Sequence, residues 1–294
     1  MRFDQNAIIE NDQYGFKTYA ELPSESELAS YYKEKYFRTN KNYDSKQNLY
    51  EIESKISEAN FLLDVLQAKV PDSLLSIVEI GAGEGFFVKA ALDRSFNIIG
   101  VDFDKNQIHE SNIACQNFFI ASDDPAGEAL SSNLNPACLV LRHVIEHVRD
   151  PLSFLDRISL NLKKETVIVI EAPHDFKNLQ KFLTKNKLVN NHYWLSYPDH
   201  LSYFEPNHIE SILKDRGFEV IETYSDFPIE IALLSDYLNY NKDETNGPKM
   251  HNLRCCFNSY VYKENSTKQV LDIFKAFKNA GLGRSFTVIA KKSD

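Results

Sequence analysis

The sequence predicts an α/β protein with a parallel, doubly wound sheet, because apolar strand segments alternate with helical segments through its central part. Apolar or β-branched runs such as 137–141 and 166–170 are typical of buried strands, and the segments between them have helical periodicity. A further strand, 76–80, runs directly into a group of glycines. Because ligands of such sheets bind where the strands end, the glycines mark the expected site.

Each element of this central part is predicted from its own pattern. The predicted strands are 76–80, 97–103, 118–121, 137–141, 166–170, 218–223 and 284–291. The predicted helices lie around 87–92, 107–114, 151–162 and 205–217. The last of these has Pro206 in its first turn and stops at Gly217, an arrangement typical of complete helices.

The segments outside this alternation have other patterns. Ser24 and Glu27 have capping-box spacing, and apolar residues recur at helical spacing from Leu49 to Leu66, so two helices are expected near the N-terminus. The polar, aromatic stretch 174–199 fits neither period and is predicted to be a lid. The predicted organisation is a helical cap over 1–70, a core over 71–224 including the lid, a helical insertion over 225–283 and a last strand within 284–294.

Composition narrows the classes of function. The 294 residues carry a formal net charge of −9, which argues against a nucleic-acid partner, because phosphate binding needs a basic surface. No apolar run reaches the roughly 20 residues of a membrane span, and no signal peptide is expected. The four cysteines include the neighbours Cys255 and Cys256 and are expected to be reduced thiols. We therefore expect a cytoplasmic protein with a small-molecule partner.

The most specific motif is Val-Glu-Ile-Gly-Ala-Gly-Glu-Gly at 78–85, followed by Gly100-Val101-Asp102. Glycines after a strand let the backbone turn sharply and approach a ligand closely. An acid at the end of the next strand, here Asp102, is suited to accept hydrogen bonds from both ribose hydroxyls of a nucleoside. The motif therefore predicts a nucleoside-containing cofactor.

The motif differs from a dinucleotide-binding fingerprint. That fingerprint requires G-x-G-x-x-G, and Phe86 stands where its third glycine would be. Glu79 precedes the glycines, and an acid there would repel a pyrophosphate but favours the positively charged amino-acid end of a sulfonium cofactor. A nicotinamide cofactor is thus the less favoured alternative.

Three segments resemble class I S-adenosylmethionine-dependent methyltransferases: VEIGAGEGFF, LRHVIEHVRDP and HLSYFEPNHIESILKDRGFEV. The similarity covers about residues 75–224. It implies a Rossmann-like, seven-stranded sheet of strand order 3-2-1-4-5-7-6, S-adenosylmethionine as cofactor and S-adenosylhomocysteine as product. The cofactor-binding residues that it implies are Glu79, Gly81, Ala82, Gly83, Asp102, Phe103, Asp123, Arg142 and His143.

The segment His143-Val-Ile-Glu146-His147 spells H-x-x-E-H, a zinc motif of some metalloproteases. Zinc would need both histidines one turn apart on a long helix. Here the motif follows a buried strand and ends shortly before Pro151, a context that indicates a strand-to-loop junction. Relatives carry a similar motif at this place without metal, so we predict no metal, with Glu146 and His147 as positioning residues.

His200 is the predicted catalytic base, because it follows the lid and histidine suits proton transfer near neutral pH. A structural histidine under the lid is the alternative. The segment also resembles the Y-x-E-H-L-S-Y-F motif of sugar C-methyltransferases, and Tyr197, Asp199 and His200 match its active-site positions, with Asp in place of Glu. Those enzymes have a cysteine-rich N-terminus, which this chain lacks. His174, just past the fifth strand, is a further catalytic candidate.

Longer similarity runs to uncharacterised methyltransferases of bacterial surface-polysaccharide gene clusters, through YGFKTYAELPSESELASYYKEKYF, APHDFKNLQ and GLGR. It implies O-methylation of a sugar, nucleotide sugar or glycan precursor, with sugar C-methylation as the alternative. A non-catalytic binding module and an NAD-dependent sugar oxidoreductase or epimerase are rivals from other classes. Most of the N-terminal tyrosines are expected to pack against the core, and Tyr14, Tyr36 or Tyr43 could close over the cofactor or the acceptor. Lys33, Lys35, Arg38 and Lys41 could form a basic rim for a nucleotide diphosphate, with a solvated helix face as the favoured alternative.

Overall fold

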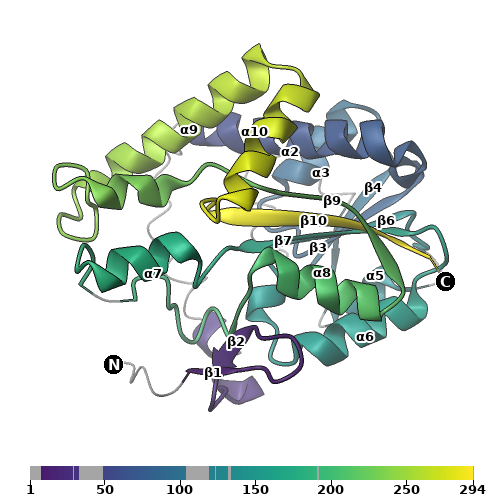
Figure 1. Ribbon diagram of the computed structural model, residues 1–294. Helices are drawn as coiled ribbons and strands as arrows, with labels where there is room; N and C mark the ends of the chain where they lie inside the picture. The colour runs from purple at the N-terminus through teal and green to yellow at the C-terminus, as the bar shows by residue number, and fades with distance from the viewer. Residues whose placement is uncertain are drawn as a thin grey trace.

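A seven-stranded sheet forms the centre of the protein (Figure 1). The computed structural model describes residues 8–28, 30–32, 49–103, 119–122, 124–131, 134–190 and 192–293. The strands of the sheet are β3 (Ile77–Ile80), β4 (Ile98–Asp102), β5 (Phe119–Ala121), β6 (Cys138–Arg142), β7 (Val167–Pro173), β9 (Phe218–Ser225) and β10 (Ser285–Lys292).

The order of these strands is β5-β4-β3-β6-β7-β10-β9. β5, β4, β3, β6 and β7 pair in parallel, whereas β10 is antiparallel to both of its neighbours, β7 and β9. Numbered within the sheet, this is the predicted order 3-2-1-4-5-7-6, which is therefore confirmed. The chain order reverses between β3 and β6, so a crevice is expected at the carboxyl ends of these two strands.

Helices cover both faces of the sheet (Figure 1). They are α2 (Leu49–Lys69), α3 (Phe86–Asp93), α5 (Pro125–Ala129), α6 (Pro151–Asn161), α7 (Asn178–Lys185), α8 (Pro206–Asp215), α9 (Asn246–Glu264) and α10 (Thr267–Asn279). One buried core joins α2, α3 and α10 to one face of the sheet, and a second core joins α5, α6 and α8 to the other. The alternation of strands and helices in the sequence produces this three-layer arrangement.

Side-chain caps fix several helix starts at the predicted places. Asp150 accepts a hydrogen bond from the backbone N–H of Ser153 at 3.0 Å, directly before α6. The predicted capping box near the N-terminus also forms, since the backbone N–H of Glu27 donates to Ser24 Oγ and the backbone N–H of Ser24 donates to Glu27 Oε2. Such caps satisfy N–H groups that have no partner within the helix.

The first seventy residues are not helical throughout, which corrects the expectation for that segment. β1 (Ile8–Glu10) and β2 (Lys17–Tyr19) form an antiparallel hairpin, and β8 (Ser202–Tyr203) pairs with β2 to complete a small second sheet. The pairing partner lies far along the chain, so local periodicity could not reveal it.

Part of the predicted lid is also regular. α7 (Asn178–Lys185) buries Leu179 and Leu183 and exposes polar residues on its other side, but eight residues are too few for a clear helical period.

Other expectations lie outside the described residues: the helix at 107–114, Asp123, Tyr36, Tyr43, Lys33, Lys35, Arg38 and Lys41. The proposed domain boundaries remain predictions.

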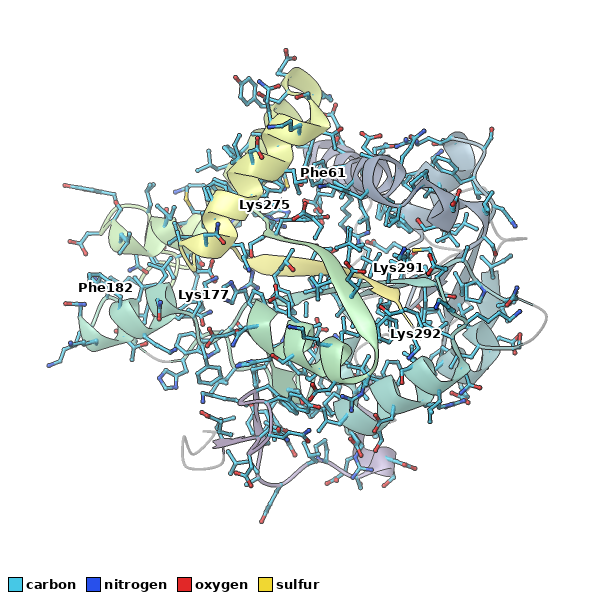
Figure 2. The ribbon with its side chains drawn as sticks, turned by 45° about the vertical axis from the view of Figure 1, so that its right-hand side comes forward. Phe61, Lys177, Phe182, Lys275, Lys291 and Lys292 are labelled. Atoms are coloured by element: carbon cyan, nitrogen blue, oxygen red, sulfur yellow. The ribbon has the colours of Figure 1, made fainter. Side chains whose placement is uncertain are left out.

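A buried ion pair connects α7 to the insertion. Lys177 Nζ lies 3.0 Å from Glu230 Oε1, and neither side chain has any exposed surface. Lys177 also donates to the backbone oxygen of Gly283, at the start of β10, and Arg284 lies 3.7 Å from the same carboxylate. Figure 2 shows Lys177 between α7 and the start of β10.

Among the described helices, none is long and apolar enough to cross a membrane.

Candidate active site

A cavity of about 270 Å³ lies where β3, β6 and β7 end. The glycine segment and the ends of these strands form its floor, and α2 and α9 close it from the other side. Its lining residues are Glu51, Ser54, Lys55, Glu58, Glu79, Gly81, Ala82, Glu84, Gly85, Phe86, Phe87, Arg142, His143, Glu171, Arg254 and Cys255. The cavity therefore combines residues from the sheet, the cap and the insertion.

The glycine segment needs glycine for steric reasons. Gly81 has φ +72°, and a Cβ atom on it would lie 2.5 Å from Val144 Cγ2. The stiff valine side chain leaves no room for that atom. The backbone N–H of Gly83 donates to Asp102 Oδ2 at 2.8 Å, which joins the segment to the end of β4. The predicted association of the glycines with Asp102 is thus present, although Gly83 and Asp102 are not in the cavity lining.

Glu79 presents a buried acid to the cavity. Its side chain is 3% exposed, and Oε2 is buried with no hydrogen-bond partner among the described residues. Burial raises the pKa of this carboxyl to about 8, although the nearby Arg142 opposes the rise. Because a buried polar atom without a partner is costly, this oxygen is suited to receive a ligand donor. A cationic amino group would satisfy both its hydrogen bond and its charge.

Arg142 and His143 are both engaged with acids. Arg142 Nε donates to Glu171 Oε2 at 2.7 Å, and His143 lies 3.1 Å from Glu171 Oε1 and 3.3 Å from Glu146 Oε1. Desolvation favours the neutral ring of His143, but the hydrogen bonds with Glu146 and Glu171 outweigh it and raise its pKa to about 10. Both residues line the cavity as predicted, and His143 is a cation there at neutral pH.

The insertion contributes a residue that sequence reasoning missed. Arg254 on α9 lines the cavity, and its buried Nε has no hydrogen-bond partner in the described part of the chain. One of its terminal nitrogens lies 3.2 Å from His251 Nδ1. A guanidinium with an unused donor is suited to bind a carboxylate. No motif surrounds Arg254, so only the folded chain places it beside the glycine segment.

Phe103 follows β4 and is 69% exposed, outside the lining of the first cavity.

A second cavity of about 360 Å³ lies beside β1 and β2. It is lined by Ile8, Ile9, Glu10, Lys17, Phe176, His192 and Leu195. Tyr14, which was expected to border the site, instead donates from its hydroxyl to Asp215 at the end of α8.

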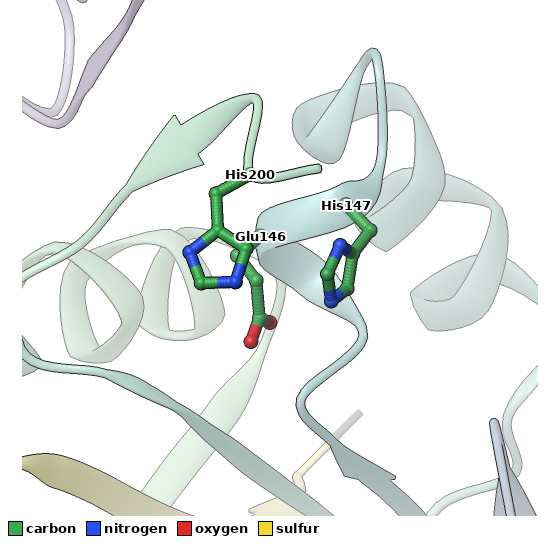
Figure 3. Close-up of side chains that lie close together, drawn as sticks. All are labelled: Glu146, His147 and His200. Carbon is green, nitrogen blue, oxygen red and sulfur yellow. The ribbon is translucent and has the colours of Figure 1, made fainter. Parts of the chain in front are cut away.

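A second polar group, Glu146, His147 and His200, adjoins the first cavity through His143. Figure 3 shows the rings of His147 and His200 on either side of the Glu146 carboxylate. The two ring centroids are 5.0 Å apart. Glu146 and His147 belong to a short 3₁₀ helix directly after β6, so the predicted strand-to-loop junction for the H-x-x-E-H segment is confirmed.

Backbone hydrogen bonds hold the segment after the lid against this 3₁₀ helix. The N–H of Leu201 donates to the backbone oxygen of Glu146 at 2.7 Å, and that of His200 donates to the oxygen of Ser196 at 2.7 Å. Burial lowers the pKa of His200 to about 4, so its ring is neutral at pH 7. The structure therefore brings His200 beside Glu146 and His147. It is not among the residues that line either cavity.

The other predicted catalytic residues have different surroundings. Asp199 lies beside His147, with its Oδ1 atom 3.5 Å from His147 Nδ1. The ring of Tyr197 packs edge-on against Tyr19, at 4.9 Å between centroids. His174 is buried next to Phe286, and burial lowers its pKa to about 3. It lines neither of the two cavities.

The sheet has seven strands in this order, glycines follow the first of them in the chain, and an acid ends the second. These features define a class I methyltransferase, whose cofactor is S-adenosylmethionine. The chain belongs to the family described as the methyltransferase domain, whose model matches residues 43–223. No curated protein matches the chain.

The chain is similar to solved structures of methyltransferases, and the two with a TM-score of 0.51 support the fold. A plantazolicin methyltransferase bound to SAH is 15% identical, with a TM-score of 0.51 over 87% of this chain and 90% of that one. Magnesium protoporphyrin IX methyltransferase from Synechocystis PCC 6803, also with bound SAH, is 12% identical, with a TM-score of 0.51 over 92% and 100%. A SAM-dependent methyltransferase from Archaeoglobus fulgidus is 19% identical, with a TM-score of 0.47 over 80% and 94%.

Proposed function

We propose that this cytoplasmic methyltransferase transfers the methyl group of S-adenosylmethionine to a hydroxyl of a small molecule, a sugar, nucleotide sugar or surface-glycan precursor. The observation that carries the cofactor part is the cavity in which the unpartnered oxygen of Glu79 and the unused donor of Arg254 both lie. A buried acid and a guanidinium with an unused Nε donor suit the ammonium and carboxylate of an amino acid. The residues present thus fit the amino-acid end of the cofactor.

The remaining cofactor contacts follow from the same placement. Asp102 would accept hydrogen bonds from the ribose hydroxyls, and Gly81 and Ala82 would allow close approach of the backbone. Arg142 and His143, which line the cavity, would border the methionine end. Phe103 is kept as a cofactor-binding candidate on the resemblance alone, and Asp123 lies outside the described residues. When bound, the cofactor supplies an electrophilic methyl group, whose bond to sulfur breaks as the acceptor oxygen bonds to carbon and whose electron pair stays on sulfur.

The acceptor hydroxyl would lie at His200, with Tyr197 and Asp199 beside it, and would lose its proton there. A hydroxyl needs such assistance, because it is a weak nucleophile while protonated. The sugar assignment rests on the resemblance of the segment from Tyr197 to Phe204, and C-methylation of a sugar is the alternative. The sugar assignment is tested by incubating the enzyme with nucleotide sugars. NMR of the product then shows whether it carries an O-methyl or a C-methyl group.

The first test of the function is calorimetric titration with S-adenosylhomocysteine. We expect the wild type to bind and Asp102→Ala to bind about tenfold or more weakly, roughly 1.4 kcal/mol, because a hydrogen-bond acceptor for the ribose is lost. NAD is the control ligand and should not bind. A wild type that binds NAD and not S-adenosylhomocysteine would contradict the assignment and favour the oxidoreductase alternative.

The pKa of Glu79 predicts how cofactor affinity depends on pH. Below pH 8 the carboxyl is protonated in the free protein, whereas binding of an ammonium group favours the carboxylate. Binding must then release a proton, so affinity for S-adenosylhomocysteine should fall by up to about tenfold per pH unit below 8 and level off above it. Titrations at pH 6, 7 and 8 test this, and Glu79→Gln should remove the dependence. A flat profile in the wild type would be contrary evidence.

Arg254 gives a prediction about ligand selectivity. Arg254→Met should weaken S-adenosylhomocysteine by about 10–100-fold, because a charge-assisted hydrogen bond is worth about 1.5–3 kcal/mol. It should leave 5′-methylthioadenosine unchanged, because that compound lacks the carboxylate. Lys263→Met is the matched control, since Lys263 lies on the same helix but is 52% exposed and pairs with Glu53. Equal weakening of both ligands would show that Arg254 supports the cavity without binding the carboxylate.

A further inference from the structure

Glu146, His147 and His200 bring three donor groups to one point (Figure 3). Each offers one ligand atom, and these atoms lie within 4.8 Å of one another. Two imidazole nitrogens and one carboxylate oxygen suit divalent first-row cations such as Zn²⁺, whereas Mg²⁺ prefers oxygen donors. The three donors are therefore close enough to hold one cation, and three protein ligands would leave further positions open.

The carboxylate of Glu146 is prepared for such a role. The side chain is 2% exposed, and Oε1 lies 3.3 Å from His143 Nδ1. Oε2 is buried with no hydrogen-bond partner among the described residues. His143 thus serves one oxygen of the carboxylate and leaves the other without a partner. A buried oxygen of this kind is costly unless a ligand binds it, and a cation would do so.

The two histidines each offer one ring nitrogen to the same place. His147 Nδ1 lies 2.6 Å from the backbone oxygen of Asp199. A carbonyl can only accept, so Nδ1 is the donor in this contact and Nε2 is the nitrogen left for a ligand. This pattern, with one ring nitrogen fixed by a backbone carbonyl, is usual for metal-binding histidines. The Nδ1 atom of His200 is buried without a partner in the described chain.

We propose that Glu146, His147 and His200 form a binding site for a divalent transition-metal cation of the Zn²⁺ type, which holds the acceptor hydroxyl. The role in the reaction rests on the proposed function, whereas the cation site itself does not. In this site His200 acts as a ligand, because its ring offers a nitrogen to the same point as Glu146 and His147. The cation then assists the loss of the proton.

The proton balance is simple. A hydroxyl oxygen bound to a divalent cation has a lowered pKa. Its O–H bond breaks, the electron pair stays on the oxygen and the proton passes to solvent water. The oxygen is then a competent nucleophile beside His143, which links the cluster to the cofactor cavity through its contact with Glu146.

This site differs from the zinc motif considered in the sequence. That motif would pair His143 with His147, whereas His143 contacts Glu146 and Glu171. The second imidazole instead comes from His200, brought in by the hydrogen bond between Leu201 and the backbone of Glu146. The two histidines are far apart in the sequence, so motif analysis does not detect the site. The proposed cation replaces the expectation that the protein binds no metal.

The test is titration of the chelator-treated, full-length protein with Zn²⁺ in the absence of cofactor, and with Co²⁺, whose visible absorption reports coordination. We expect one equivalent to bind, with Mg²⁺ binding much more weakly. Glu146→Gln and His200→Ala should each weaken Zn²⁺ by about tenfold or more. His192→Gln, which removes a histidine stacked on Trp194, is the matched control and should bind as the wild type.

Several outcomes would overturn the site. The first is that the wild type does not bind Zn²⁺ stoichiometrically. The second is that the variants Glu146→Gln and His200→Ala bind Zn²⁺ as tightly as the wild type. The third is that Co²⁺ keeps the spectrum of its hexaaqua ion. Folding of each variant is checked by circular dichroism and by its affinity for S-adenosylhomocysteine. If that ligand binds and Zn²⁺ does not, the cation site is wrong and the methyltransferase stands. If Zn²⁺ binds and the cofactor product does not, the failure belongs to the proposed function.

Discussion

Glu230→Gln should destabilise the protein by about 3–5 kcal/mol, measured as the free energy of unfolding in urea. Glu230 lies 3.0 Å from Lys177 and 3.7 Å from Arg284, and the side chains of Glu230 and Lys177 are entirely buried. The substitution keeps the shape of the side chain but removes the charge that both cations share. The buried ammonium of Lys177 then keeps the backbone oxygen of Gly283 as an acceptor but loses its carboxylate partner, and Arg284, whose side chain is 39% exposed, loses the same partner.

Glu210→Gln is the matched control. Glu210 pairs with Lys278 at 3.5 Å, but both side chains are 28% exposed, so the expected loss is about 0–1 kcal/mol. Adding Lys177→Met to Glu230→Gln should recover part of the stability, because the buried ammonium is then absent as well. If Glu230→Gln unfolds at the same urea concentration as the control, the ion pair does not stabilise the contact between lid and insertion.

His200→Ala should lower turnover by about 10²–10⁴-fold. Its ring lies beside Glu146 and His147, and its removal takes away the group at which we propose that the acceptor loses its proton. Affinity for S-adenosylhomocysteine should be unchanged, because His200 is not among the residues that line the cofactor cavity. Turnover is measured as the rate at which methylated product forms from an acceptor that the wild type methylates.

The combination of the two measurements separates the roles of His200. Unchanged turnover would eliminate both the base and the ligand role and leave the structural alternative. A parallel loss of turnover and cofactor affinity would mean that the segment after the lid supports the whole site.

The central sheet could be predicted because its information is local. A buried strand such as Val167–Ile170 and the amphipathic α2 each carry their own period, and alternation then dictates a doubly wound sheet. The glycine segment and Asp102 were found for a similar reason, since Gly81 needs its positive φ and its lack of a Cβ atom. The resemblance added the antiparallel position of the last strand.

The parts that could not be predicted depend on contacts between distant segments. β2 becomes a strand through pairing with β8, and Arg254 reaches the cofactor cavity only because α9 packs beside α2. The cluster of Glu146 with His200 forms through one backbone hydrogen bond from Leu201. None of these leaves a spacing or a period in the sequence.

The pairing of β2 with β8 ties two distant segments of the chain to each other. Thr18 Oγ1 donates to the backbone oxygen of Leu201, and the hydroxyls of Tyr19 and Tyr203 are hydrogen-bonded. The β1–β2 hairpin therefore supports the segment that carries His200. A substitution in β2 that breaks this pairing is expected to disturb the position of His200, although the two residues are far apart in the sequence.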